Sequence, residues 1–266
     1  MISIPVKNDK VASGYEMRSF PMLDPHRLVH MLMTNIGLEI PESRVARFWR
    51  IHREELKEPW ALASPASSKH IPFAIYGDGA KIRDDGTKIV GLFLSMPAIW
   101  RPRSSRCGRW CVFALEEHKL FGSATLDEVY RRLVWSCNVL FTGNDPDQPG
   151  KPLCNGRVFT CTEIKGDWQW LKMSVHFKST WQSMQEVCFL CDTLARSNDQ
   201  KKLYYCCDDD PHWTNYDVLG FLTHQIVDPT PCVLEVIDGF VPTFDFFKNW
   251  KYAGSYKFEC SHHALA

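Results

Sequence analysis

The sequence predicts an α/β protein built around a mixed β-sheet. Three short apolar or β-branched segments follow one another between residues 73 and 115, which is typical of strands joined by short turns. A strongly amphipathic helical segment at 125–141 comes next, and a fourth strand-like segment follows at 158–164. The chain has 266 residues, 45% of them hydrophobic, so it is long enough to bury the core of such a sheet.

The region before the strands is predicted to be helical over residues 24–56. Asp24 and Pro25 can cap and open a first helix that ends before Gly37, and Pro41 opens a second helix that Pro59 ends. The second helix has one largely apolar face, which comprises Val45, Phe48, Trp49 and His52. Residues 61–69 are small and polar enough for a linker. We therefore expect an N-terminal helical segment over residues 1–69.

The strand region divides at its turn signals. The expected strands cover 73–76, 89–95 and 110–115, with a hairpin turn at 84–86 between the first two. In the helix that follows, Thr125 is the expected N-cap and Glu128 completes a capping box. A Gly-, Asn- and Pro-rich loop over 143–156 then leads to the fourth strand.

Two strand-like segments each run through a glycine into one acidic residue, Asp78 in the first and Asp167 after the fourth. Two carboxylates delivered by strand ends are the minimum for holding catalytic metal ions. Gly-Asp after a strand is also ordinary turn chemistry, so both interpretations stay open for each residue alone. The order strand, strand, strand, helix, strand is that of the ribonuclease-H-like fold, where the first and fourth strands are neighbours. This is a fold analogy, and a generic α/β domain with two turn aspartates is its alternative.

Charge and cysteine content bound the partners and the compartment. Lys plus Arg equals Asp plus Glu at 31 each, so any attraction to nucleic acid must come from a local patch. The 11 cysteines are odd in number, and the N-terminus lacks the apolar run of a signal peptide. No apolar stretch approaches the roughly 18 residues of a membrane span. We expect an intracellular, soluble protein without a membrane partner.

Several short pieces carry a resemblance to a known family. They are residues 20–27 (FPMLDPHR), 47–49 (RFW), 58–60 (EPW), 70–78 (HIPFAIYGD), 165–171 (KGDWQWL), 188–191 (CFLC), 212–213 (HW) and 229–240 (PTPCVLEVIDGF). In this order they resemble repeated, largely uncharacterised proteins of dinoflagellate genomes, which are similar in outline to DDE transposases of the CACTA type. The resemblance spans most of the chain.

The resemblance implies a ribonuclease-H-like core over 70–185 and a Cys-containing insertion with an incomplete C-terminal region over 186–266. It implies DNA as the partner, a nuclear location, and Mg²⁺ held by Asp78 and Asp167 as the first two catalytic acids. The family's pattern continues after residue 240 into an Asp-containing segment with a Met-His pair, whereas this chain continues differently. Asp245 is the nearest candidate for the third acid. A chain without that acid is a fragment or an inactive copy.

A second group of residues suggests zinc. Cys188 and Cys191 have the spacing of half a zinc site, and His212 with either Cys206 or Cys207 could complete four ligands. Four protein ligands would make the Zn²⁺ structural, because no coordination position stays open for catalysis. The alternative is a scatter of reduced, buried thiols in a Cys-rich chain.

Basic and aromatic residues near the expected site have two interpretations each. A nine-residue stretch that is expected to be a loop contains four arginines: Arg101, Arg103, Arg106 and Arg109. They could contact phosphates, or the stretch could be an ordinary solvated loop. Trp168 and Trp170 could stack on bases, although the hydrophobic core is the preferred place for them. His70 is expected to be structural.

The function that the sequence predicts is that of a transposon-derived protein. Its ancestral reaction is two-metal cleavage of DNA phosphodiesters and strand transfer, which this copy has either kept or lost. The alternative is a non-catalytic, zinc-stapled module on the same scaffold that binds DNA or protein.

Overall fold

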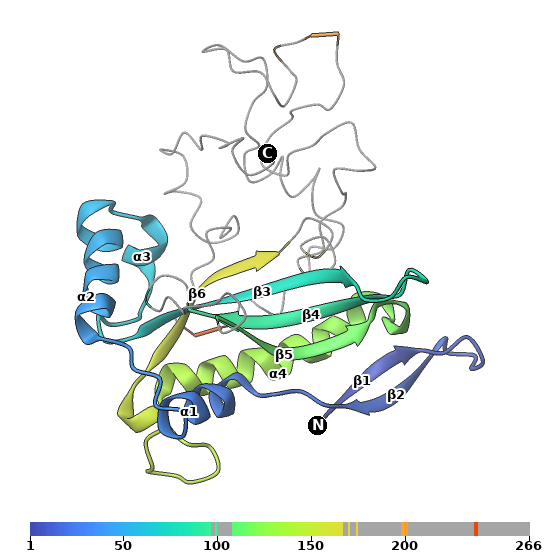
Figure 1. Cartoon of the computed structure of the whole chain (residues 1–266), viewed down its shortest axis with the longest axis horizontal. Coiled ribbons are helices and arrows are strands. Elements are labelled where there is room, and N and C mark those ends of the chain that lie inside the picture. The colour runs from blue at the N-terminus through green and yellow to red at the C-terminus, as the bar shows by residue number, and fades with distance from the viewer. Residues whose placement is uncertain are drawn as a thin grey trace. The chain divides into compact units, whose positions relative to one another are not determined.

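The structure is a computed structural model of the chain, and it describes residues 1–96, 99, 108–166, 170, 174, 198–199, 201 and 237–238. The chain divides into two compact units: Met1–Ser174 with Pro231–Thr243, and Val175–Thr230 with Phe244–Ala266. The helices and strands named below all belong to the first unit (Figure 1). The predicted divisions at residues 69 and 185 stay predictions.

A mixed sheet of four strands forms the centre of this unit. The strands are β3 (Ile71–Lys81), β4 (Lys88–Ser95), β5 (Arg109–Glu116) and β6 (Phe159–Gly166). Their order is β5-β4-β3-β6; β3, β4 and β5 pair antiparallel, and β6 pairs parallel with β3. The predicted α/β class and mixed sheet are therefore confirmed, and each of the four predicted strands is present with longer bounds.

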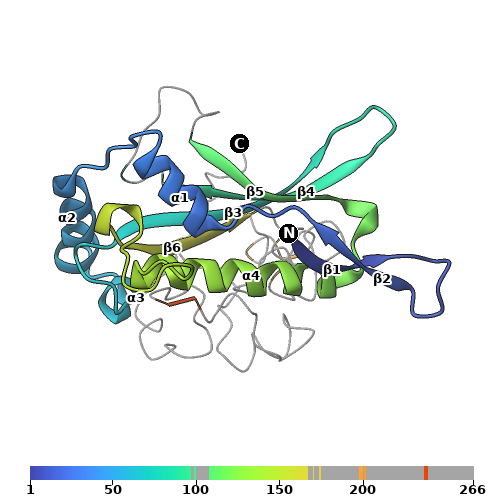
Figure 2. The ribbon, with the colours of Figure 1, turned by 90° about the horizontal axis from the view of Figure 1, so that it is seen from below.

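One long helix, α4 (Gly122–Thr142), lies along one face of the sheet (Figure 2). The predicted start of this helix at Thr125 is wrong, because the helix begins three residues earlier and Phe121 is its N-cap. The Thr125 hydroxyl instead accepts the backbone N–H of Phe121 at 2.8 Å and donates to the carbonyl of Pro5 at 2.6 Å. Glu128 pairs with Arg131 along the helix rather than closing a capping box. Thr125 thus joins the helix to the N-terminus.

The N-terminus forms a hairpin that the sequence did not predict. Its strands β1 (Ile2–Lys7) and β2 (Tyr15–Phe20) pair antiparallel, and β1 packs on α4. Ile4 and Val6 are fully buried, which gives β1 its hydrophobic anchor. Pro5 stands between them and lacks a backbone N–H, so the segment has a weak strand signal.

Three helices connect the hairpin to the sheet: α1 (Pro25–Thr34), α2 (Glu42–Arg50) and α3 (Pro59–Ala63). A π-helical turn, η1 (Ile51–Glu55), continues α2 without a break. The two predicted helices are confirmed, but the second ends at Glu55, before the positive φ of 51° at Lys57, and Pro59 opens α3 instead of ending the second helix. Trp49 on the buried face of α2 donates its indole N–H to the carbonyl of His70 at 2.8 Å.

A buried polar network joins α1 to α4. The Arg132 guanidinium donates to both carboxylate oxygens of Asp24 at 2.7 Å and lies 4.0 Å from the centre of the Trp135 ring. The Ser136 hydroxyl accepts the backbone N–H of His26 at 3.0 Å and shares a second hydrogen bond of 2.8 Å with the Nδ1 atom of the same residue. Burial lowers the pKa of His26 below 6.5, opposed in part by the charge of Asp24. His26 is therefore a neutral core residue.

We expect the free energy of unfolding to decrease as the pH falls from about 7.5 to about 5.5. Burial lowers the pKa of both His26 and His70 below the unfolded value of 6.5, so the unfolded chain takes up protons that the folded chain does not. Each histidine adds a slope of at most about 1.4 kcal/mol per pH unit. Urea unfolding at a series of pH values measures this dependence. His26→Asn keeps a side-chain hydrogen-bonding group for Ser136 and removes the titration, so it should flatten the pH dependence; an unchanged slope would contradict the assignment to His26.

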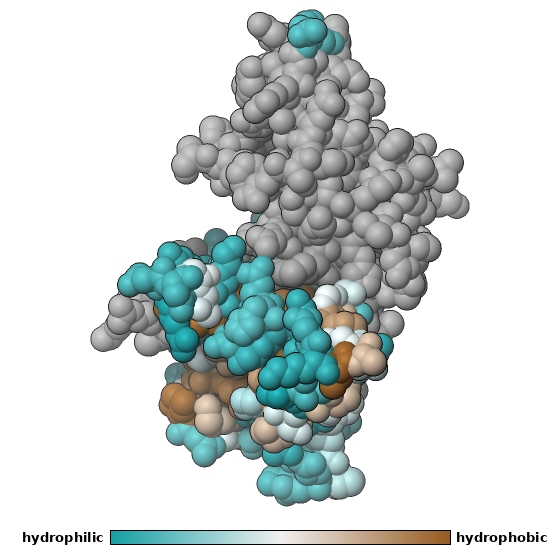
Figure 3. Space-filling view, turned by 90° about the vertical axis from the view of Figure 1, so that its right-hand side faces the viewer, coloured by the Kyte–Doolittle hydropathy of each residue, from teal (hydrophilic) through white to brown (hydrophobic). Residues whose placement is uncertain are grey.

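The turns of the β1–β2 and β3–β4 hairpins point to the same side of the first unit (Figure 2). On that side the described surface is mostly hydrophilic (Figure 3). In the part of the chain that the structure describes, none of the helices combines the length and apolarity that crossing a bilayer requires.

Candidate functional site

The predicted catalytic residue Asp78 lies on β3, the strand that pairs with both β4 and β6. Its side chain is half-buried, and the Tyr76 hydroxyl donates a hydrogen bond of 2.8 Å to Oδ2. Residues two apart in a strand point to the same face, so Tyr76 and Asp78 share one face of the sheet. Tyr76 fixes one carboxylate oxygen, while no residue in the described ranges bonds to the other. Asp78 is thus a positioned carboxylate at the surface.

Arg109 lies next to this pair. It is the first residue of β5, and its guanidinium carbon is 4.9 Å from the centre of the Tyr76 ring. The ring of Phe93 on β4 lies 6.3 Å from that of Tyr76. A cation over an aromatic face is stabilised by the ring quadrupole, so Arg109 is held over Tyr76, the residue that bonds to Asp78. Of the four predicted phosphate-binding arginines, Arg109 lies within the described residues, and its role in phosphate binding stays a prediction.

Two glycines precede the two predicted acids and face each other across parallel strands. Gly77 on β3 pairs in register with Gly166 on β6. Trp170 fills the space above both: a Cβ built on Gly77 would lie 1.8 Å from its ring and a Cβ on Gly166 would lie 2.2 Å from it. Trp170 is 1% exposed, and its ring packs edge-on against Tyr130 of α4. The prediction that Trp170 belongs to the core is confirmed.

Most other predicted site residues lie outside the described ranges. They are the acids Asp167 and Asp245, the zinc candidates Cys188, Cys191, Cys206, Cys207 and His212, and the arginines Arg101, Arg103 and Arg106. Among the residues that the structure does describe, no three His, Cys, Asp or Glu side chains come together as a metal-binding group.

The described cysteines of the core have the properties of structural thiols. Burial raises the pKa of Cys154 and of Cys161 to about 12, and it raises that of Cys137 well above its ordinary value. A thiol binds metal and reacts as the thiolate, so these three side chains are poor ligands and poor nucleophiles at neutral pH.

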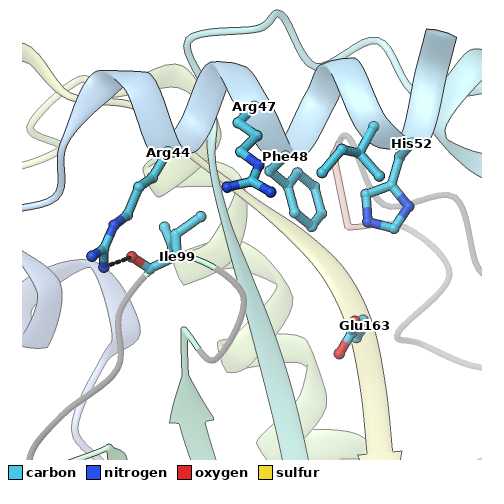
Figure 4. A pocket seen from close by; sticks show the side chains of 7 residues that line it. Arg44, Arg47, Phe48, His52, Ile99 and Glu163 are labelled. Atoms are coloured by element: carbon cyan, nitrogen blue, oxygen red, sulfur yellow. Dashed lines mark hydrogen bonds between the residues drawn. The ribbon is translucent and has the colours of Figure 1, made fainter. Parts of the chain in front are cut away.

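A cavity of about 530 Å³ lies between α2 and β6 (Figure 4). Its walls carry two arginines of α2, a phenylalanine, a histidine and one acid of β6; the lining residues are Arg44, Arg47, Phe48, Ile51, His52, Ile99 and Glu163. This cavity was not predicted from the sequence. The sequence did contain a sign of it, because the five lining residues at positions 44, 47, 48, 51 and 52 are spaced to fall on one face of a helix.

The chemistry available at Asp78 is that of a hard cation ligand. Magnesium prefers carboxylate oxygens and commonly uses one or two of them together with substrate phosphates. The described residues supply one such carboxylate, oriented by Tyr76, whose ring also carries the Arg109 guanidinium. Asp167 follows the paired Gly166 directly in the sequence but lies outside the described residues, so the structure itself supplies a single carboxylate here.

Comparison of the chain with protein families, with curated proteins and with solved structures found no match.

Proposed function

We propose that this chain is a transposon-derived protein with a ribonuclease-H-like core, whose ancestral reaction is two-metal cleavage and strand transfer of DNA. One observation carries the proposal: β3 and β6 are parallel neighbours, and Gly77 is in register with Gly166. Asp78 and Asp167 each follow one of these glycines. Neighbouring strands are about 4.8 Å apart, so parallel strands that continued in this register would bring both carboxylates within reach of shared metal ions.

The chain's own residues would divide the work at this site. Asp78 and Asp167 would hold Mg²⁺, and Asp245 is the candidate third acid. The bound ions would activate the attacking oxygen and stabilise the charge on the phosphate. Tyr76 restrains the Asp78 carboxylate through Oδ2, and Arg109 adds a positive charge on the same face, where a phosphodiester would lie.

The experiment is a nicking assay on supercoiled DNA with Mg²⁺ or Mn²⁺ present. We expect Asp78→Asn to lower the rate by more than the roughly 10–100-fold that loss of an outer-shell partner costs. Asp84→Asn is the matched control, because Asp84 is exposed in the turn between β3 and β4 and should leave the rate unchanged. Cleavage that survives in Asp78→Asn would overturn the assignment of this residue.

The same assay separates the catalytic proposal from its alternative. A wild-type chain that does not nick DNA with either metal would contradict retained catalysis. It would favour the non-catalytic module that binds DNA or protein, with Zn²⁺ held by the candidate cysteines and His212. Measurement of bound zinc in the purified chain tests that second part directly.

A further inference from the structure

The cavity between α2 and β6 carries a positive charge that the fold does not use. Arg44 and Arg47 are one helical turn apart and exposed, and within the described ranges neither forms an ion pair. Arg44 donates one N–H to the carbonyl of Ile99 at 3.3 Å, which orients the guanidinium and leaves further donors available. Glu163 pairs with Lys165, so the opposite wall is close to neutral.

The neighbouring arginines of this helical segment have structural partners instead. Arg50 pairs with Glu55. Arg53 donates to the carbonyls of Ala61 and Ser64 and lies 4.3 Å from the centre of the Trp49 ring. Arg53 is therefore bound into the fold and Arg50 forms an exposed ion pair, whereas the two arginines that line the cavity have no ion-pair partner among the described residues. Arginine forks suit phosphate oxygens in particular.

The cavity also has a rigid aromatic wall. The rings of Phe48 and His52 are 4.5 Å apart, and Trp60 packs behind His52 at 5.1 Å. The Nδ1 atom of His52 is buried and has no hydrogen-bond partner among the described residues, so water or a ligand in the cavity has a hydrogen-bonding position to fill there. His52 lies in the π-helical turn η1, a rare conformation that occurs frequently at functional sites. A planar, hydrogen-bonding group fits this wall.

The cavity opens on the same face of the sheet as Asp78. Glu163 is in register with Ala74, and alternation along β3 places Ala74, Tyr76 and Asp78 on one face. Four residues of strand separate the cavity from Asp78, about 13 Å. A single nucleic-acid strand rises about 3.4 Å per nucleotide along a duplex, so this is the length of roughly four nucleotides.

We propose that this cavity binds one unpaired nucleotide of a DNA strand, with its phosphate on Arg44 and Arg47 and its base against Phe48 and His52. The volume of about 530 Å³ exceeds what a lone phosphate needs and lies within the range of about 300–1,000 Å³ of small-ligand pockets. The inference rests on the proposed function for DNA as the substrate. It concerns binding away from the carboxylates, so it does not depend on metal or on cleavage.

The test measures binding of a fluorescent single-stranded DNA octamer by anisotropy, with EDTA present to prevent cleavage. We expect the double variant Arg44→Gln, Arg47→Gln to bind at least about tenfold more weakly at 50 mM salt. The plot of the logarithm of the binding constant against the logarithm of the salt concentration should also be less steep. Its slope should change by about 0.7 for each phosphate that the variant no longer neutralises. The matched control is the double variant Arg50→Gln, Arg53→Gln, which removes the same charge from the same helical segment. A milder control is Arg50→Gln alone. Each control should weaken binding far less than the Arg44→Gln, Arg47→Gln variant does. Circular dichroism verifies that each variant is folded.

A second probe tests the base. The wild-type chain should bind the octamer more tightly than an abasic octamer, because stacking contributes about 1–3 kcal/mol per base. Equal affinity for both probes, or equal weakening in the cavity and control variants, would overturn the nucleotide site. If the nucleotide site is overturned in this way but the chain still nicks DNA and needs Asp78 to do so, the proposed function stands. Octamer binding that depends on Arg44 and Arg47 without any nicking would overturn retained catalysis and leave the nucleotide site standing.

Discussion

Gly77→Ala should destabilise the protein by about 3 kcal/mol or more, because the added methyl group overlaps a buried ring. A Cβ at this position would lie 1.8 Å from Trp170, which is 1% exposed and packed against Tyr130. The indole is buried and the contact is far below 3.0 Å, so either the ring or β3 must shift. Urea unfolding followed by circular dichroism measures the loss of stability.

Gly79→Ala is the matched control for this change. Gly79 lies two residues along the same strand, and the nearest atom to its added Cβ would be the carbonyl oxygen of Ile89 at 3.9 Å, an ordinary van der Waals distance. We expect this variant to stay within about 0.5 kcal/mol of wild type. A Gly77→Ala protein as stable as Gly79→Ala would show that Trp170 is not seated on the paired glycines.

Asp24→Asn should cost about 2–3 kcal/mol at neutral pH, because it removes a bidentate, charge-assisted pair. Burial alone would raise the pKa of Asp24, but the hydrogen bonds and charge of Arg132 outweigh it and hold that pKa below 3.8. The stabilisation is therefore complete above about pH 4 and is lost as the pH falls through the lowered pKa. Urea unfolding of wild type and variant at pH 7 and in acid measures both effects; the difference should shrink in acid.

The control for Asp24 is an exposed aspartate that also pairs with arginine. Asp147 and Arg27 are 2.6 Å apart, and both side chains are about three-fifths exposed. Asp147→Asn should therefore cost less than about 1 kcal/mol. Equal losses of stability in the two variants would contradict the special role of the pair that joins α1 to α4.

The sheet was predictable from the sequence because its signals are local. Strands β3 to β6 are apolar runs bounded by turn residues, and α4 has an unbroken apolar stripe. The predicted start of α4 was wrong for a tertiary reason: the hydroxyl of Thr125 is used by Phe121 and by Pro5, which lies far away in the sequence. The hairpin β1–β2 was missed because it depends on burial against α4 more than on its own pattern.

The candidate site was predictable only in part. The position of Asp78 at a strand surface follows from the sequence, and Tyr76 could have been added from alternation alone. The place of Arg109 over the Tyr76 ring could not, because it depends on the register between β4 and β5, which contains an irregularity at Leu92 and Phe93. The cavity beside Arg44 and Arg47 needs the packing of α2 near β6, which no local pattern encodes.

The parallel pairing of β3 with β6 also governs how the chain can fold during synthesis. Ile71 and its partner Phe159 are separated in the sequence by β4, β5 and α4. Their pairing is therefore a long-range contact that forms late. Until β6 leaves the ribosome, β3 has one unpaired edge, which includes residues 71–75 that are buried in the folded sheet. Such an edge is a template for pairing with other chains. A nascent chain that stops before residue 159 is therefore the form of this protein most exposed to aggregation.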